Sequence, residues 1–250
     1  MRYVHVSIQG AVAEVRLQRG KVNALDDGVV EELAACFRQL ADDPAVRGSI
    51  LTGTGKFFSF GFDIPEFLGY SKEAFTEYLG KFTALYRELF VHPKPVVAAI
   101  NGHAVAGGCM LAIACDVRIM VGGRAKIGLN EIGFGSSVFA GSAGMLVYCV
   151  GRRRAQEILY AGTLLSADQA LAIGLIDAIA SDDGLLSAAR EMASRHAEKD
   201  PAAFRSLKRL LRKPVLDDMV ARESQSIREF VDIWYSEQTW RRLQEIRIHA

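Results

Sequence analysis

The stretch PVVAAINGHAVAGGCMLAIACDVRIM, residues 95–120, decides the fold. It begins with an uninterrupted apolar run over 95–100, which is typical of a strand that is buried on both faces of a parallel sheet. An Asn-Gly pair ends that strand, and a Gly-Gly pair opens a predicted helix at about 106–114. The segment 116–121 predicts another strand. Strands and helices that alternate through short glycine turns indicate an α/β core.

The sequence on either side of this stretch continues the alternation. Towards the N-terminus, the predicted elements are a β-hairpin (3–8 and 11–17), a helix that Asp26 caps and that stops before Pro44, a buried strand (49–52), a loop rich in Gly and Phe (53–70) and a helix (71–91) that Ser71 caps. Towards the C-terminus, residues 126–151 predict a short strand, a Gly-rich loop and a helix. Beyond about residue 182 only helical periodicity remains, and Pro201 and Pro214 are predicted to separate its helices.

Composition narrows the class of protein. The chain has 250 residues, of which 50% are hydrophobic and 24% charged, and its net charge is +1. It has the apolar residues to build a core, which excludes a disordered protein, and its balanced charge argues against a nucleic acid as the main partner. The four cysteines lack a CxxC pair and lie in apolar surroundings, so we expect buried, reduced thiols. We expect a cytoplasmic protein without a membrane segment, because no secretory signal, long apolar run or peroxisomal address is visible.

Several catalytic and cofactor motifs are missing from the sequence. It contains no P-loop, no HExxH helix and no GxSxG nucleophile elbow. Gly53 and Gly55 follow a strand but do not extend to GxGxxG, and the five histidines lack metal-ligand spacing. We therefore expect no metal, no dinucleotide and no Ser-His-Asp triad.

Two glycine turns, 59–63 and 101–109, each follow a predicted buried strand and precede a predicted helix. Glycine lets a ligand approach the backbone, and the free N–H groups at a helix start point towards such a ligand. Two of these N–H groups that converge on one oxygen would form an oxyanion hole. Two ordinary strand-to-helix turns would show the same spacing, so the spacing leaves both interpretations open.

Six segments of the chain resemble the crotonase (enoyl-CoA hydratase/isomerase) superfamily, in the family's order and at its spacing. They are residues 22–25, 58–64, 93–102, 106–109, 115–119 and 166–176. The resemblance implies an α/β fold that is built as a spiral of ββα units over 1–195. It also implies a helical region over 196–250 that serves oligomerisation and covers the ligand, and assembly as a homotrimer or a dimer of trimers.

The ligand that the resemblance implies is an acyl thioester of coenzyme A in lipid metabolism. Coenzyme A would be part of the substrate, and no separate cofactor is expected. The oxyanion hole is carried over to the backbone N–H groups of Phe62 and Gly107, which would hold the thioester oxygen of an enolate. The further substrate-binding positions are Lys21 and Val22 at the CoA nucleotide, and Ala24, Phe60, Asp63, Ile64, Met110 and Phe134.

The acid and base residues would decide the reaction. Hydratases of the family have two glutamates; here the first position is Met110, whose thioether cannot take up a proton, and the second is Glu131. One carboxylate suffices to move a double bond, because it can take a proton from C2 and return it at C4. The context of Glu131 also resembles the mitochondrial type of Δ3-Δ2-enoyl-CoA isomerase. We therefore predict an isomerase in which apolar neighbours such as Ile132, Phe134 and Met110 raise the pKa of Glu131.

Other interpretations stay open. The same oxyanion hole could serve an acyl-CoA hydrolase, a decarboxylase or a weak hydratase, and a non-catalytic relative could bind only CoA or RNA. Glu131 could be a carboxylate that only favours a helix start, and Asp63 could be only a helix cap. The phenylalanines of the first loop could line an acyl pocket or pack among themselves. One basic helical face could be solvated, contact CoA phosphates or bind nucleic acid; it comprises Arg205, Lys208, Arg209 and Arg212.

Overall fold

The structure, a computed structural model, describes residues 1–246, and its strands form three sheets within that range. The six-stranded sheet, in the order β1-β2-β4-β7-β9-β12, contains β1 (Val4–Gln9), β2 (Val12–Leu17), β4 (Gly48–Thr52), β7 (Val96–Ile100), β9 (Val117–Val121) and β12 (Ala178–Ala180). The four-stranded sheet, in the order β11-β10-β8-β5, contains β5 (Phe57–Ser59), β8 (His103–Val105), β10 (Lys126–Gly128) and β11 (Leu165–Ser166). A short sheet pairs β3 (Ala24–Leu25) with β6 (Gly61–Phe62).

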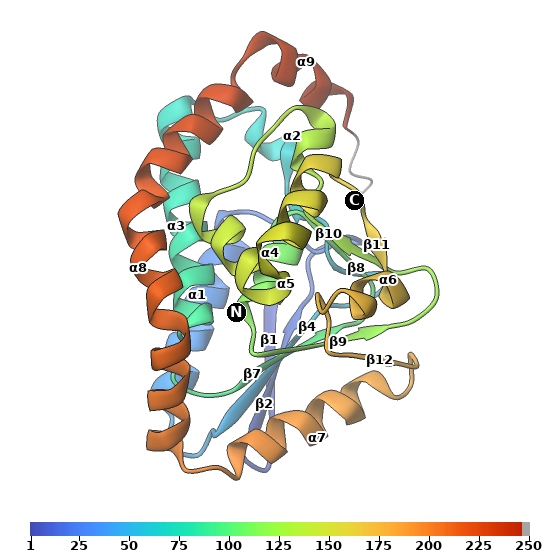
Figure 1. Ribbon diagram of the computed structural model, residues 1–250, viewed down its shortest axis with the longest axis vertical. Coiled ribbons are helices and arrows are strands. Elements are labelled where there is room, and N and C mark those ends of the chain that lie inside the picture. The colour runs from blue at the N-terminus through green and yellow to red at the C-terminus, as the bar shows by residue number, and fades with distance from the viewer. Residues whose placement is uncertain (247–250) are drawn as a thin grey trace.

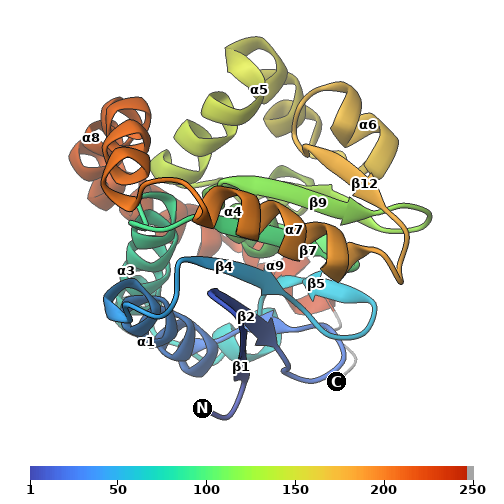
Figure 2. The same cartoon turned by 90° about the horizontal axis from the view of Figure 1, so that it is seen from below.

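Successive turns of the chain each add one strand to both larger sheets. β4 is followed by β5, β7 by β8, and β9 by β10, and a helix comes after each pair: α3 (Lys72–Phe90), α4 (Gly107–Ala114) and α5 (Ala140–Ala161). The strands that neighbouring turns contribute to a sheet pair in parallel. Figures 1 and 2 show the strands of the large sheet crossing the middle of the molecule between the helices. The predicted α/β fold, a spiral of ββα units, is confirmed.

Side-chain caps place the early helices where the sequence predicts them. The Asp26 carboxylate accepts a hydrogen bond of 2.8 Å from the Val29 N–H at the start of α1 (Asp27–Asp42). The Ser71 hydroxyl accepts one of 3.2 Å from the Ala74 N–H at the start of α3. Such caps satisfy backbone donors that have no acceptor within the helix.

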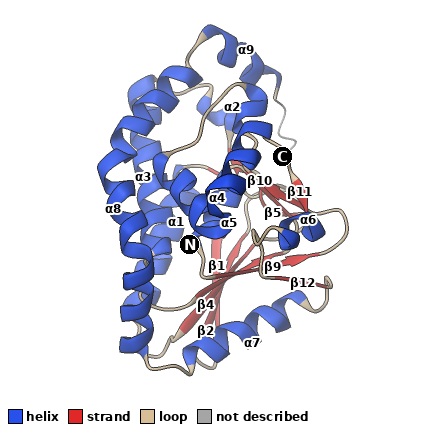
Figure 3. Ribbon diagram, in the orientation of Figure 1, coloured by secondary structure: helices blue, strands red, loops and turns tan. Residues whose placement is uncertain are grey.

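The core forms around the segments with unbroken apolar sequence. Every residue of β4, β7 and α4 is buried, as their apolar runs predict. Figure 3 shows α7 (Leu185–Ala197) on the opposite side of the large sheet from α4. Three of the four cysteines are buried and Cys149 is partly buried; all four are free thiols, as predicted. None of the helices within residues 1–246 combines the length and apolar character that a membrane crossing requires.

The C-terminal part differs from the prediction at Pro214. A single helix, α8 (Pro201–Trp234), runs through this proline, so the predicted break there is wrong. Proline removes one helical hydrogen bond, to the carbonyl of Leu210, but both residues are exposed and water can reach that carbonyl. Arg212 and Met219, before and after the proline, are buried. Packing on both sides of Pro214 therefore maintains the helix, and α9 (Glu237–Glu245) follows it.

Candidate active site

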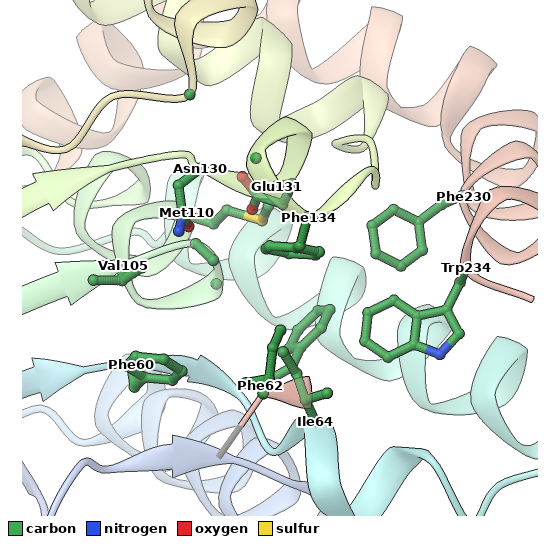
Figure 4. A pocket seen from close by; sticks show the side chains of 15 residues that line it. Phe60, Phe62, Ile64, Val105, Met110, Asn130, Glu131, Phe134, Phe230 and Trp234 are labelled. Carbon is green, nitrogen blue, oxygen red and sulfur yellow. The ribbon is translucent and has the colours of Figure 1, made fainter. Parts of the chain in front are cut away.

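A cavity of about 370 Å³ lies where the first glycine turn, the start of α4, η1 (Glu131–Phe134) and the end of α8 meet (Figure 4). Among the described residues, Glu131 is the only ionisable side chain that lines this cavity. We therefore call the cavity the Glu131 cavity. Its lining comprises Phe60, Phe62, Ile64, Val105, Ala106, Gly107, Met110, Asn130, Glu131, Gly133, Phe134, Gly162, Phe230, Trp234 and Ile246. The cavity is therefore an apolar chamber around one carboxyl group.

The two glycine turns approach each other at this cavity. A Cβ atom on Gly61 would lie 2.9 Å from the carbonyl oxygen of Val105 and 3.0 Å from the backbone nitrogen of Gly107. The φ of Gly61 is +95°, which other residues rarely adopt. The Ser59 hydroxyl holds the first turn, since it accepts from the Gly61 N–H at 3.1 Å and donates to the Asn23 carbonyl at 2.7 Å. Glycine at position 61 is thus what brings the backbones of Phe62 and Gly107 to one place.

The start of α4 opens onto the cavity without a side-chain cap. Gly107 is its first residue, and all residues of the helix are buried. The preceding residue, Ala106, has φ 49° and ψ −117°, a strained conformation for a residue with a side chain. The first N–H groups of a helix find no acceptor within the helix, and an acceptor on a ligand can serve them.

Glu131 is buried without a partner. It is 4% exposed, and neither carboxyl oxygen has a hydrogen-bond partner in the described part of the chain. Burial raises the pKa of Glu131 to about 8, because the ionised form is poorly solvated there. Met110 and Phe134 share the cavity with it, and Figure 4 shows both on its side of the chamber. Ile132 is 48% exposed and does not line the cavity, so the burial comes from the other neighbours and not, as the sequence suggests, from Ile132.

The structure separates the predicted site residues into three groups. Seven line the Glu131 cavity, and these are Phe60, Phe62, Ile64, Gly107, Met110, Glu131 and Phe134. Lys21 and Val22 line a neighbouring cavity of about 450 Å³ together with Lys56 and Phe57. The rings of Phe57 and Phe60, one from each cavity, lie 5.9 Å apart, so the two cavities adjoin. Ala24 and Asp63 line neither of them.

Asp63 holds the backbone next to Phe62. Its carboxylate caps α2 (Ile64–Phe67) by accepting from the Glu66 N–H, which confirms the predicted cap. It also pairs at 2.7 Å with Arg19, and Arg19 pairs at 2.7 Å with Asp26. The first glycine turn is therefore tied to the start of α1 through one guanidinium group.

The phenylalanines of the first loop divide between the two predicted roles. Phe60 and Phe62 line the Glu131 cavity. Phe58 and Phe67 are fully buried in the core, and the Phe62 ring itself packs at 4.9 Å from that of Phe82. Part of the loop is thus a pocket wall, and part is a packed core.

No sequence motif marks the far wall of the cavity. Phe230 and Trp234 come from α8, and Ile246 follows α9. The spacing of Ile227, Phe230, Val231 and Trp234 shows an apolar helical face, but such a face packs in the same way against any apolar surface. Spacing predicts the burial of these residues and not the cavity that they border.

The basic face of α8 is solvated only in part. Arg205 and Arg209 are exposed, whereas Lys208 and Arg212 are buried and pair with Asp116 at 2.8 and 3.1 Å. For these two residues the solvated interpretation is wrong, because their partner lies far away in sequence. Elsewhere in residues 1–246, no group of three or more His, Cys, Asp or Glu side chains has an arrangement that could hold a metal ion.

Comparisons with known proteins agree with this geometry. A family model described as "Enoyl-CoA hydratase/isomerase" matches residues 7–242. The "Probable enoyl-CoA hydratase" of Bacillus subtilis is 35% identical over 214 residues, which are 84% of this chain and 82% of that protein. The "Enoyl-CoA delta isomerase 1, mitochondrial" of Mus musculus is 31% identical over 221 residues, which are 88% of this chain and 76% of that protein. The crystal structure of human mitochondrial Δ3-Δ2-enoyl-CoA isomerase has a TM-score of 0.93 at 28% identity and covers 97% of this chain and 95% of its own.

Proposed function

The chain belongs to the enoyl-CoA hydratase/isomerase family, and from this premise we propose that it moves the double bond of a 3-enoyl-CoA from C3 to C2. The observation that carries the proposal is the isolation of Glu131. Among the described residues that line its cavity, no second side chain can exchange a proton. A shift of a double bond needs only one such group, because one carboxylate can remove and return the same proton.

The proposed reaction has two proton transfers. Ionised Glu131 takes the C2 proton, and the electron pair of that C–H bond moves into a dienolate whose charge lies on the thioester oxygen. Protonated Glu131 then donates the proton to C4, and the double bond comes to lie between C2 and C3. The pKa of about 8 suits both steps, because a group that titrates near the working pH can both accept and release a proton.

We propose that the N–H groups of Phe62 and Gly107 hold the dienolate oxygen. Two observations support this: Gly61 brings the two turns within contact distance, and α4 begins at Gly107 without a side-chain cap. Fixed donors that face a developing negative charge are worth roughly 3–4 kcal/mol of barrier each in comparable enzymes.

The coenzyme A part of the substrate would lie in the adjoining cavity. Lys21 and Lys56 line it, and neither makes an ion pair within residues 1–246. Two unpaired ammonium groups suit the phosphates of CoA. The acyl chain would then extend past Phe60 into the Glu131 cavity and end against Phe230 and Trp234.

Hydration of a 2-enoyl-CoA is a second candidate, and one observation favours it. The side-chain oxygen of Asn130 is buried at the Glu131 cavity and has no hydrogen-bond partner, so it could accept a hydrogen bond from a water molecule. An amide oxygen can orient water but cannot take up its proton at neutral pH, and Met110 offers no carboxylate. We therefore expect hydration to be the slower reaction.

One set of assays separates the candidates. The purified protein is incubated with 3-hexenoyl-CoA, with 2-hexenoyl-CoA and with hexanoyl-CoA, and the products are separated by chromatography. We expect conversion of the first to the 2-enoyl thioester, slow or no hydration of the second, and no release of CoA from the third. Hydration that outpaces isomerisation, or release of free CoA, would contradict the proposal.

We also propose assembly as a homotrimer or a dimer of trimers. Leu207, Leu210 and Leu211 on α8 are 61–69% exposed and give the helix an apolar outer face, which is typical of a surface that a partner covers. Light scattering on the eluting protein gives the mass. A monomer at assay concentration would contradict this expectation.

A further inference from the structure

A third cavity, of about 300 Å³, shares no lining residue with the Glu131 cavity. It forms where the end of α7 and the start of α8 meet the segment between α1 and β4 and the turn before β7. Figure 1 shows the connection between α7 and α8 at the bottom of the view, far from α2 and α9 at the top. Because Phe204 forms part of the wall, we call it the Phe204 cavity.

The wall of the Phe204 cavity is positively charged. It carries Arg47, Lys94, Lys199 and Arg205 against a single carboxylate, Asp42. Arg47 and Lys94 donate to backbone carbonyls and form no ion pair at contact distance within residues 1–246, although the carboxylates of Asp42 and Asp43 lie close enough to act on Lys94. The side chains of Lys199 and Arg205 make neither an ion pair nor a hydrogen bond within the described part of the chain. Two guanidinium and two ammonium groups thus outnumber the carboxylates of Asp42, in the wall, and of Asp43, next to it.

Two buried basic residues of α8, Lys208 and Arg212, add to the positive charge of the wall. The Lys208 ammonium lies 6.0 Å from the centroid of the Phe204 ring, and Lys208 and Arg212 share the one carboxylate of Asp116. Two buried cations against one anion leave an excess charge of one under the cavity wall. An anionic group in the cavity would therefore experience a favourable field from both layers.

The remaining wall is flat and apolar, with one unsatisfied polar atom. The rings of His196 and Phe204 lie 6.1 Å apart, and four prolines, Pro44, Pro93, Pro95 and Pro201, contribute further rigid surface. The Nδ1 atom of His196 is buried without a hydrogen-bond partner. Because this nitrogen has almost no accessible surface, a ligand in the cavity would meet the rings of His196 and Phe204 and not the nitrogen.

We propose that the Phe204 cavity binds a small organic anion in which a phosphate or carboxylate group is attached to a flat ring. The anionic group would bind Arg205 and Lys199, and the ring would lie against Phe204 and the prolines. The volume suits such a ligand, since it stands at the lower end of the range for small-molecule sites. The inference does not depend on the reaction proposed for Glu131, because no residue lines both cavities.

Titration calorimetry with four probes tests the proposal. Phenyl phosphate and benzoate carry both parts, inorganic phosphate carries only the anion, and benzyl alcohol carries only the ring. We expect phenyl phosphate or benzoate to bind at least tenfold more tightly than inorganic phosphate and benzyl alcohol, and the tighter of the two identifies the anionic group. Equal affinities for all four probes would overturn the proposal.

Matched variants locate the binding. Arg205→Ala should weaken binding of the best probe about tenfold, because a charge-assisted hydrogen bond is lost. Arg209→Ala, which removes an exposed arginine one helical turn further along α8 and outside the cavity, should leave it unchanged. Phe204→Leu should weaken binding of the ring-bearing probe and not of inorganic phosphate. Equal effects of the two arginine variants in proteins with wild-type melting temperatures would overturn the proposal.

Discussion

Glu131 and Asp116 are both withdrawn from water, and their surroundings are opposite. Asp116 accepts hydrogen bonds from the Val96 N–H and from Lys208, both at 2.8 Å, and pairs with Arg212 at 3.1 Å. Glu131 has no partner on either oxygen. Burial lowers the pKa of Lys208 to about 8 despite the nearby carboxylate, whereas burial raises the pKa of Glu131 to about 8 with no cation to oppose it.

This difference in partners means that Asp116 stabilises the fold and Glu131 does not. A buried ion pair leaves both charges compensated, and removal of one partner is costly because the other charge stays buried. An unpartnered buried carboxylic acid gives the fold no such stabilisation, and a strongly shifted pKa in a cavity is the feature on which the proposed chemical role of Glu131 rests. The contrast should appear as a loss of activity when Glu131 is changed and as a loss of stability when Asp116 is changed.

The largest expected effect is on turnover at Glu131. In Glu131→Gln the amide keeps the shape of the side chain but cannot carry the proton, so we expect kcat for isomerisation of 3-hexenoyl-CoA to fall by about 10²–10⁴-fold. The melting temperature should stay the same or rise, because no paired charge is lost. Thermal denaturation and steady-state kinetics on the same preparation measure both.

Asp116→Ala should lower stability and leave turnover unchanged, which is the reverse of the effect of Glu131→Gln. It leaves Lys208 and Arg212 without their carboxylate, so we expect the free energy of unfolding to fall by about 3–5 kcal/mol, with kcat retained below the new melting temperature. Asp217→Ala is the matched control, because it breaks the exposed pair with Lys213. That variant should change stability by less than about 1 kcal/mol. Similar losses in the two variants would contradict the importance of burial.

The pH dependence follows from the raised pKa of Glu131. Only the ionised form can take the C2 proton, so kcat/KM should fall about tenfold for each pH unit below about 8 and level off above it. Stability has the opposite trend: the folded protein keeps a proton that the unfolded chain loses above the ordinary value of 4.5, so stability falls as pH rises from 4.5 to about 8. Glu131→Gln should lack this fall. A flat rate profile from pH 6 to 9 would show that another group limits the reaction.

Much of the fold follows from local sequence. Apolar runs and the caps Asp26 and Ser71 correctly place the strands of the large sheet up to β9 and the helices α1 and α3, and the six motifs identify the family. The segment 53–70, predicted as a loop, instead contains the short elements β5, β6 and α2, and β8 lies within the predicted turn 101–109, because these strands are only two or three residues long and depend on pairing across the sheet. The predicted break at Pro214 is wrong because helix propensity describes an isolated helix. In the folded chain, buried side chains on both sides of the proline keep α8 continuous.

The site is predictable only where a motif carries it. Glu131, Phe62 and Gly107 stand in recognisable segments, and the structure places all three around one cavity. Trp234 and Phe230 stand in a helix without a motif, so their contact with the cavity depends on how α8 folds back. The pairing of Lys208 with Asp116, 92 residues apart, is likewise a result of tertiary packing that no spacing rule contains.

The smallest expected effect concerns Glu223, whose hydrogen bonding is intermediate between that of Glu131, which has no partner, and that of Asp116, which has two cations. One of its oxygens accepts from the Tyr86 hydroxyl at 2.6 Å and from the Gly141 N–H at 3.4 Å, and the other has no partner. Tyr86→Phe removes one hydrogen bond and no charge, so the free energy of unfolding should fall by about 1 kcal/mol. Tyr160→Phe, at a residue that is 72% exposed, is the control and should have no measurable effect. If Tyr86→Phe lowered the free energy of unfolding as much as Asp116→Ala does, a single hydroxyl would stabilise a buried carboxylate as strongly as two cations do. The contrast between Glu131 and Asp116 would then reflect hydrogen bonding rather than charge.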